Sequence, residues 1–270
     1  PAPENYRIDF TTAKEKDQTI KLYIDAFDED LPYIWIDLNK NGIKDEGEEV
    51  TKSGESTYTI DEQSITLYGK VRGFGCTNNQ LTSLDASNNT ALTVLDCDNN
   101  ELTNLDVSGC TALETFGCDN NQLTSLDVSG CTALDNFSCT NNKLTSLNVS
   151  GCTALTSLHC LDNLLENLDV SSCTALIQFS CADNQLRSLD VSGNTKLYHL
   201  LDCCKNKIRG TEMTELINSL PDRTSKTAGT FHVMRDEAAD GNECTDSQIK
   251  DAQGKNWNVY VDNGLKDPIP

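Results

Sequence analysis

The feature that most constrains the fold of this 270-residue chain is a leucine spacing that repeats every 21 residues. Each period divides into a long half, such as LTNLDVSGCTA from Leu102, and a short half with one residue fewer, such as LETFGCDNNQ from Leu113. Both halves read L-x-x-L-x followed by a small apolar residue. The two leucine series are Leu81, Leu102, Leu123, Leu144, Leu165 and Leu186, and Leu92, Leu113, Leu134, Leu155, Leu176 and Leu197.

A repeat of this length predicts a stack of coils, because one coil alone would leave its leucines in water and only its neighbours can cover them. The pattern resembles that of the leucine-rich repeat family, L-x-x-L-x-L-x-x-N/C-x-L, over residues 71–208. The resemblance implies an α/β-type repeat fold, namely a leucine-rich repeat solenoid of parallel β-strands. So short a coil leaves little room for helix, as in bacterial surface and secreted members with short nested repeats.

An asparagine recurs with the same period, and we expect it to form a ladder along the stack. Stacked coils bring equivalent residues to about 4.8 Å, the spacing of neighbouring strands. An inward amide at a tight turn can satisfy buried backbone groups of its own coil and of the next. The ladder consists of Asn79, Asn100, Asn121, Asn142, Asn163, Asn184 and Asn206.

Most of the 13 cysteines also follow the repeat. Parallel Cβ atoms near 4.8 Å are too far apart for a disulfide, which needs about 3.5–4.5 Å, and no C-x2-C pair completes a zinc site. We therefore expect buried free thiols that pack as small apolar groups. Cys203, Cys204 and Cys244 break the 21-residue register, and a disulfide between Cys204 and Cys244 is an alternative to free thiols there. One series takes the place that valine has in the other half: Cys76, Cys97, Cys118, Cys139, Cys160 and Cys181. The second series takes the Asn-or-Cys corner of the repeat: Cys110, Cys131, Cys152 and Cys173.

The long half is nearly constant from coil to coil and carries an acidic stripe with an adjacent serine series. Such a stripe is either a solvated face that prevents aggregation or a contact surface for calcium or sugar. Asn148 interrupts it. Its members are Asp85, Asp106, Asp127, Asp169 and Asp190.

The short half varies freely at the two positions that flank its second leucine-type residue. In leucine-rich repeats these positions point outward from the strand, so this variable face is the candidate surface for recognising a ligand. Repeat drift without selection would look the same. The expected ligand-binding residues gather toward the C-terminal coils and are Asn136, Ser157, His159, Leu161, Gln178, Tyr198 and His199.

A twelve-residue acidic loop, DLNKNGIKDEGE, occupies residues 37–48 between segments with the alternation of strands. It has oxygen ligands at positions 1, 3, 5, 7, 9 and 12 and a glycine at position 6, which is the calcium-loop pattern. Its flanks are not helical, and it is similar to the calcium loops of bacterial surface B-type β domains. The alternative is an acidic Asn-Gly hairpin without metal. Calcium is the one expected cofactor, and its ligands would be Asp37, Asn39, Asn41, the carbonyl of Ile43, Asp45 and Glu48.

The two ends of the chain differ from the repeat. Residues 1–70 contain several segments with strand alternation and predict a β-rich domain or cap. Beyond the solenoid of residues 71–208, TEMTELINSLP and TDSQIKDAQGK predict helices, and GTFHVM and WNVYV predict strands. Residues 209–270 are therefore expected to continue the parallel arrangement and to cover the last coil, with Trp257 against it.

Composition excludes several classes of function. The net charge of −21 is spread along the chain without a basic run, which disfavours binding to nucleic acid or to an anionic membrane surface. No run of about 18 apolar residues is present to span a bilayer. Common enzyme motifs such as G-x-S-x-G, H-E-x-x-H and the phosphate-binding loop are missing, and the three histidines lack evident triad partners.

These observations favour a non-catalytic module that binds a protein or glycan at the bacterial cell surface. We expect a monomer that is secreted or surface-anchored, and the start at Pro1 instead of methionine fits the removal of a leader. The alternative is a structural spacer or adhesin stalk of the cell envelope without a dedicated ligand. A glycan-processing hydrolase is the third hypothesis.

Overall fold

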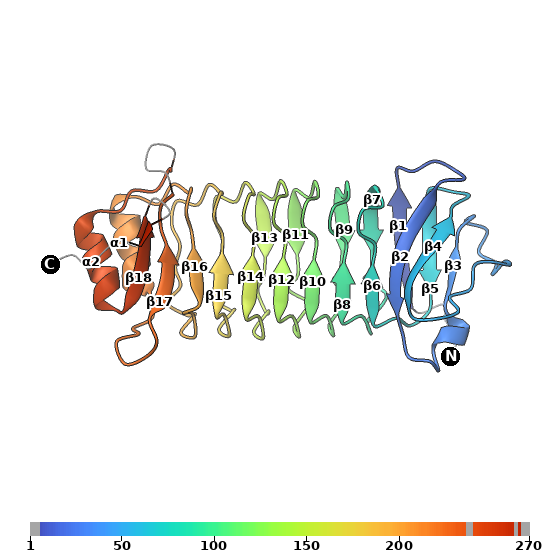
Figure 1. Cartoon of the computed structure of the whole chain (residues 1–270), viewed down its shortest axis with the longest axis horizontal. Coiled ribbons are helices and arrows are strands. Elements are labelled where there is room, and N and C mark those ends of the chain that lie inside the picture. The colour runs from blue at the N-terminus through green and yellow to red at the C-terminus, as the bar shows by residue number, and fades with distance from the viewer. Residues whose placement is uncertain (1–5, 236–239, 262–263, 266–270) are drawn as a thin grey trace. The chain divides into compact units, whose positions relative to one another are not determined.

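The computed structural model describes residues 6–235, 240–261 and 264–265, and it confirms the predicted solenoid of parallel β-strands with little helix (Figure 1). The chain divides into two compact units, Pro1–Leu134 and Asp135–Pro270. The described residues include no helix that is long and apolar enough to cross a membrane. The domain boundaries at residues 70 and 208 stay a prediction.

The first unit starts with strands that hydrogen-bond directly to its first coil. β1 pairs antiparallel with β5 and β7, and β2 pairs antiparallel with β4 and β6. A short 3-10 turn, Leu31–Tyr33, leads into β3, which pairs with β5. The strands up to the first coil are β1 (Arg7–Thr12), β2 (Thr19–Asp25), β3 (Trp35–Asp37), β4 (Gly54–Thr59), β5 (Ser64–Tyr68), β6 (Gly73–Gly75) and β7 (Leu81–Asp85).

Both halves of each period in the first unit supply short parallel strands. β6, β8 and β10 pair along one side, and β7 and β9 pair along the other. Leucines of the two repeat series are buried between these sides, as are Phe74 and Phe116. The later strands of this unit are β8 (Val94–Asp96), β9 (Asn104–Asp106), β10 (Thr115–Gly117) and β11 (Ser125–Asp127).

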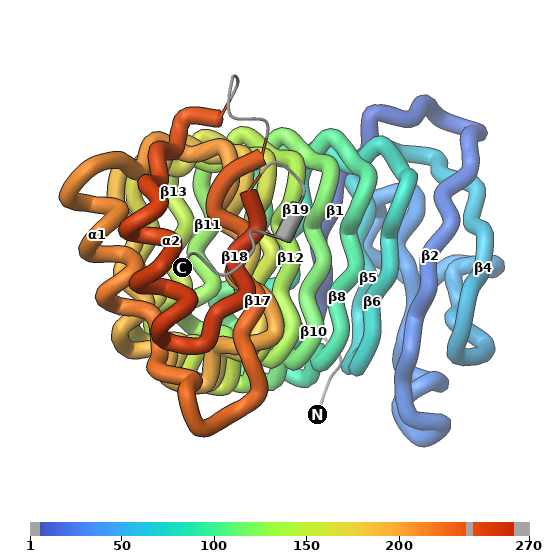
Figure 2. The backbone as a smooth tube through the Cα atoms, turned by 60° about the vertical axis from the view of Figure 1, so that its left-hand side comes forward, coloured from blue at the N-terminus to red at the C-terminus, as the bar shows by residue number. Residues whose placement is uncertain are grey.

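The second unit continues the same pattern and then changes to a longer strand-helix repeat. β12, β14, β15, β16, β17 and β18 pair in parallel in that order. Helices α1 and α2 lie side by side, and α2 packs against β18 (Figure 2). The elements are β12 (Asn136–Ser138), β13 (Ser146–Asn148), β14 (Ser157–His159), β15 (Gln178–Ser180), β16 (Leu200–Asp202), α1 (Gly210–Ser219), β17 (Gly229–His232), α2 (Asp246–Gly254), β18 (Trp257–Val261) and β19 (Gly264–Leu265).

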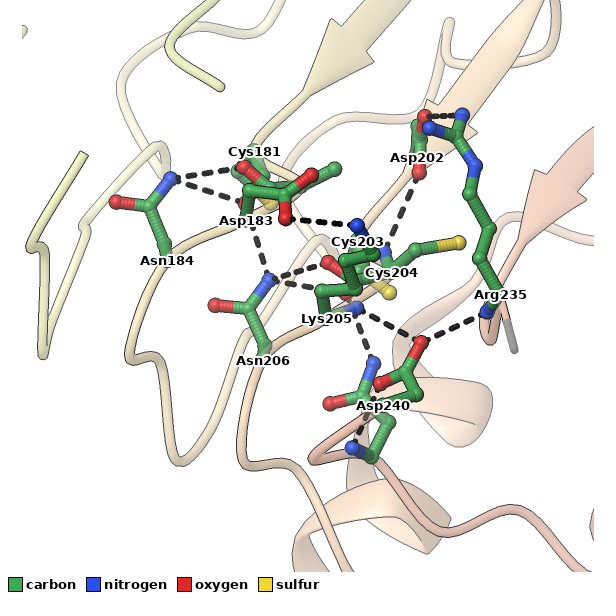
Figure 3. Close-up of polar contacts among 12 residues, drawn as sticks. Cys181, Asp183, Asn184, Asp202, Cys203, Cys204, Lys205, Asn206, Arg235 and Asp240 are labelled. Carbon is green, nitrogen blue, oxygen red and sulfur yellow. Dashed lines mark hydrogen bonds and ion pairs between the residues drawn. The ribbon is translucent and has the colours of Figure 1, made fainter. Parts of the chain in front are cut away.

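The structure contains the predicted asparagine ladder. The Asn100 side-chain nitrogen lies 3.0 Å from the carbonyls of Cys76 and Cys97, and its oxygen accepts from the Leu81 backbone N–H at 3.0 Å. Asn184 and Asn206 repeat the arrangement in the second unit (Figure 3). Each amide thus joins its own coil to the preceding one.

The residue before each ladder asparagine has a left-handed backbone, which asparagine and aspartate tolerate better than most residues. This conformation lets the chain reverse direction at the turn and aim the next side chain inward. It accounts for the Asn-Asn pairs of the sequence. The left-handed residues are Asn78, Asn99, Asn120, Asn141, Asp162, Asp183 and Lys205, with φ between 51° and 59°.

All 13 cysteines lie among the described residues and carry free thiols, and all except Cys244 are buried. The two series tie the coils in opposite directions. The Cys97 thiol donates to the Gly117 carbonyl of the following coil at 3.3 Å, whereas the Cys110 thiol donates to the Ala86 carbonyl of the preceding coil at 3.3 Å. Cys160 repeats the forward contact and Cys173 the backward one in the second unit.

Cys203 departs from the constant step, as expected, but it is not an exception to the core series. Its carbonyl accepts from the Asn206 side chain at 2.9 Å, as the Cys181 carbonyl accepts from Asn184 at 3.2 Å. Cys203 therefore continues the core series one position later than a constant step would place it, because one extra residue lies between Leu197 and Leu201.

The ladder also extends past Ile208, where the sequence pattern stops. Asn242 accepts from the Ile208 backbone N–H at 2.9 Å and donates to the Cys203 and Val233 carbonyls at 2.8 Å each. The stretch between Asn206 and Asn242 holds α1 and β17. The C-terminal segment is thus a longer turn of the same stack, closed by the buried indole of Trp257.

Candidate functional site

The variable face of the second unit is formed by the outward residues of consecutive parallel strands. The strand register places Ser157 beside Asn136 on one side and beside Gln178 on the other. The central residue of each of these strands, such as Leu158 and Phe179, is buried. The alternation follows from the two-residue period of a strand, so the side chains that flank each buried residue share one surface.

Four of the predicted residues form a hydrogen-bonded row across this face, here called the histidine row: Ser157, His159, Gln178 and His199. The Ser157 hydroxyl lies 3.1 Å from His159 Nε2, which also lies 2.8 Å from the Gln178 side-chain nitrogen. The Gln178 side-chain oxygen lies 2.9 Å from His199 Nδ1. Three successive coils therefore contribute to one polar cluster.

Tyr198 borders the histidine row and contacts both His199 and Arg223. Its ring packs edge-on against the His199 ring at 6.3 Å. The guanidinium of Arg223 lies 4.8 Å from the Tyr198 ring centroid, and it donates to the Thr227 carbonyl. A buried cation against the ring face fixes the tyrosine by a cation–π contact.

The remaining two predicted ligand residues lie outside the histidine row. Asn136 is exposed on β12, one strand beyond Ser157. Leu161 follows the end of β14, and its carbonyl accepts from the Asn163 side chain. Leu161 belongs to the turn of the ladder, so it is not a neighbour of the cluster on the strand face.

Counting by a constant repeat length misplaces the outward positions of the last coil. The constant step assigns them to His199 and Leu201, but Leu201 is fully buried opposite Phe179. Leu200 and Asp202 are the strand residues beside Gln178 and Ser180. His199 reaches the face from just before the strand, because the coil has one added residue.

A second row of the same face, missed by sequence reasoning, runs from Ser180 to Asp202 and then to His232 and Tyr260. The buried Asp202 pairs with Arg235 at 2.5 Å. The His232 ring lies 4.7 Å from the Tyr260 ring, and burial lowers the pKa of His232. The signal available in the sequence was the strand prediction for GTFHVM and WNVYV, whose alternate residues had to share the face.

The acidic stripe of the long half has a local structural role. The Asp106 side chain accepts from the Ser108 backbone N–H at 2.9 Å, and Asp169 accepts from Ser171 at 2.8 Å and has its pKa lowered by that serine. Asn148 makes the same contact with Ser150 at 3.1 Å. Only an acceptor oxygen is required for such a turn, which explains why asparagine can replace aspartate.

The loop at residues 37–48 is closed around its own backbone. The buried Asp37 carboxylate accepts from the backbone N–H groups of Asn41 and Gly42, at 3.1 and 2.9 Å. The buried Glu48 carboxylate accepts from those of Leu38 and Asp45, both at 2.9 Å. Gly42 has φ of 75°, which glycine adopts without strain.

Three of the five predicted side-chain ligands of calcium contact one another in this loop. The Asn39 and Asn41 side-chain nitrogens both donate to one Asp45 oxygen, at 2.8 and 2.7 Å, and these bonds lower the pKa of Asp45. The Asn39 and Asn41 side-chain oxygens accept from the backbone N–H groups of Asn41 and Ile43, at 3.0 and 2.7 Å, so it is the amide nitrogens that face Asp45. No group of three or more His, Cys, Asp or Glu side chains in the described residues is arranged to hold a metal.

No protein-family model and no curated protein matches the chain. Among solved structures, the functional domain of InlJ from Listeria monocytogenes, described as including a cysteine ladder, is 22% identical with a TM-score of 0.40. That match covers 76% of this chain and 56% of the InlJ chain, which is less than two thirds of its length. An internalin (inlF) from Listeria monocytogenes str. 4b F2365 is 14% identical with a TM-score of 0.35, and the match covers 70% of this chain and 79% of that one.

Proposed function

We propose that this chain is a non-catalytic recognition module that binds a protein or glycan through the outward face of β14, β15 and β16. The histidine row carries the proposal. Its imidazole, amide and hydroxyl groups come from three successive coils, and the imidazole of His159 stands where other coils have Gly117 and Ser138. Such groups donate and accept hydrogen bonds without a fixed charge, as sugars and peptide backbones do.

The arrangement suits recognition because its side chains restrain one another before any ligand arrives. Gln178 is held between two imidazoles, and Tyr198 is held by Arg223. Groups that are already ordered lose less conformational entropy on binding, which strengthens association without new contacts. The strands beneath them are paired in parallel from β14 to β16.

Nucleophilic catalysis fits the same atoms poorly. In a serine–histidine pair the imidazole nitrogen must be available to accept the serine proton. His159 Nε2 faces the Ser157 hydroxyl at 3.1 Å, but the Gln178 side-chain nitrogen approaches the same atom more closely, at 2.8 Å. The amide therefore competes for the nitrogen that a hydrolase would reserve for its nucleophile.

The test is a screen of the purified protein on glycan and protein arrays, followed by calorimetry with any ligand found. Removing a central contact of a binding surface commonly costs tenfold or more in affinity, so Gln178→Ala and His199→Ala should each weaken binding by about tenfold. Asn167→Ala is the matched control, since Asn167 is an exposed polar residue of the constant half in the same unit. A spacer without a ligand would show no saturable binding, which would overturn the proposal.

The proposal includes a bacterial cell-surface or secreted setting and calcium at the loop of residues 37–48. The support for calcium is the spacing of Asp37, Asn39, Asn41, Asp45 and Glu48, which matches the calcium-loop pattern in a loop closed by hydrogen bonds. A bound ion would neutralise these carboxylates. The loop residues would then hold β3 and the returning chain, which meet at an antiparallel bridge between Trp35 and Glu49, in one arrangement.

A further inference from the structure

A hollow lined by cationic side chains lies at the turns of the last coils of the second unit. Its volume is about 450 Å³, and Arg187, Lys205, Lys207 and Arg209 line it together with two ladder asparagines and Gly241. All four cationic residues are exposed. No carboxylate lines the hollow among the described residues, although the chain as a whole carries a net charge of −21.

The two arginines occupy equivalent places in adjacent coils. Arg187 follows Leu186, and Arg209 follows Ile208; the backbone N–H of each apolar residue donates to the next ladder asparagine, at 2.9 Å in both cases. Equivalent residues of stacked coils are about 4.8 Å apart, so the two guanidinium groups share one surface. The coil directly before Arg187 has Glu166 in the same place, and the four coils before that have threonine: Thr82, Thr103, Thr124 and Thr145.

The two lysines lie on either side of Asn206. Lys207 follows this ladder asparagine, at a position that varies among the coils: Gln80, Glu101, Gln122, Lys143, Leu164 and Gln185. Lys205 precedes it, at the left-handed position where most coils have asparagine or aspartate. A lysine with φ of 51° costs conformational free energy that asparagine would largely avoid. What Lys205 adds, compared with the asparagine or aspartate at this position in most coils, is a positive charge.

Two of the four cations are not compensated by a carboxylate. Lys205 lies 3.3 Å from Asp183, and Arg209 lies 2.9 Å from Glu243, in exposed ion pairs that contribute little and exchange readily. Lys207 donates to the neutral Gln185 amide oxygen at 2.9 Å. Arg187 has no ion pair within the described part of the chain.

Hydrogen bonds connect the lining of the hollow to the chain beside it. The Lys205 backbone N–H donates to Asp240 at 2.9 Å, and the same carboxylate oxygen accepts from the Arg235 backbone at 2.7 Å (Figure 3). Arg209 donates to the Gly241 carbonyl at 2.7 Å. These bonds join Asp240 and Gly241 to the last coils.

We propose that this hollow binds a sugar or cyclitol that carries sulfate or phosphate ester groups. The site is separate from the histidine row and does not depend on its function. Ligand pockets measure about 300–1,000 Å³, so the hollow can take a small oligosaccharide segment. Arginine matches the oxygens of a sulfate or phosphate group in a bidentate manner, and lysine adds a point charge. A long nucleic acid fits less well, because its continuous phosphate charge would pass over an acidic protein surface.

The experiment is calorimetric titration of the full chain with two probes, a chondroitin sulfate tetrasaccharide and inositol hexakisphosphate. At least one probe should bind saturably, with an affinity that falls as the salt concentration rises. The double variant Arg187→Thr and Lys207→Gln restores residues that other coils carry, so it should fold normally by circular dichroism. It should weaken binding at least about tenfold, since each change removes a charge-assisted contact.

The matched control is Lys143→Gln, which removes the same charge at the place of Lys207 three coils earlier. It should change the affinity by less than about twofold, because exposed charges that far apart are largely screened. An equal loss in Lys143→Gln would reduce the effect to non-specific charge and overturn the proposal. Absence of saturable binding by both probes at low salt, or equal binding of inorganic sulfate alone, would also overturn it. Binding of only one probe would support the site and identify the ester.

Discussion

Asn99 and Asn100 are adjacent in the sequence but have opposite structural roles. Asn99 is exposed, with a left-handed backbone at φ of 55°, and makes the turn. Asn100 is 8% exposed, and its side chain joins the carbonyls of Cys76 and Cys97 to the backbone N–H of Leu81. One asparagine serves through its backbone and the other through its side chain.

This relationship predicts unequal effects of substitution. Asn99→Gly should change the free energy of unfolding by less than about 0.5 kcal/mol, because glycine adopts the left-handed conformation freely. Asn100→Ala should lower it by about 3–5 kcal/mol, since several buried backbone groups lose their partners. Urea unfolding of the two variants measures the difference. Similar losses for both would show that the ladder does not carry the stability assigned to it.

The cysteines should be inert to alkylation in the native protein. Only a thiolate reacts efficiently, and burial raises the pKa of Cys110, Cys160 and Cys173 to about 12 each. Cys244 is only partly buried, but burial raises its pKa to about 12 as well. Iodoacetamide at about pH 8, near the pKa of a free thiol, should therefore label every thiol in denaturant and very few before unfolding. Mass spectrometry counts the labels, and rapid native labelling of the core series would contradict the packing.

The half-buried Asp98 should make stability depend on pH. Burial raises its pKa from 3.8 to about 6, with the Asp119 backbone N–H opposing and the Asp96 charge adding to the rise. A carboxyl whose pKa is higher in the folded state favours folding when protonated, so its contribution falls as the pH rises from about 4 to about 6. Asp98→Asn keeps an acceptor for the Asp119 N–H and should stabilise the protein by about 1 kcal/mol above pH 6, after allowance for solvent screening.

Thermal melts of wild type and Asp98→Asn across this pH range measure the effect. The two curves should meet near pH 4 and separate as the pH rises to about 6. A constant difference between them at every pH would mean that the carboxyl does not titrate in this range.

Calcium at about 1 mM should raise the melting temperature by several degrees, because a ligand that binds only the folded state stabilises it. Asp37→Ala should abolish the calcium-dependent shift. The variant also loses the bonds to Asn41 and Gly42, so the shift and not the melting temperature itself is the relevant measurement. Asp28→Ala is the control, since Asp28 is exposed and outside the loop. The absence of a shift in wild type would leave the loop as a metal-free hairpin.

Much of the fold could be predicted because each structural role recurs at one place in every period. The leucines, the ladder asparagines and the two cysteine series each follow from a repeated contact between equivalent residues. The left-handed role of residues such as Asn99 was missed, since side-chain chemistry alone does not distinguish the two members of an Asn-Asn pair.

The candidate site was predictable only in part. Ser157, His159, Gln178 and His199 do meet, because they lie on or beside consecutive strands. The positions of Leu200 and Leu201 could not be assigned, because a constant repeat length conceals a single added residue. The cationic hollow was missed for a related reason: Arg187 and Arg209 are distant in sequence, and only the stack brings them together.

The lengthened period between Cys181 and Cys203 shows where such an array can accept inserted residues during evolution. The extra residue lies among Tyr198, His199 and Leu200, while the asparagines on either side keep their hydrogen bonds to the backbone. Insertions at this place can therefore lengthen the chain into a new loop while the hydrogen bonds of the asparagine ladder stay intact. The same place is open to a protein engineer, who could graft a loop there without redesigning the array.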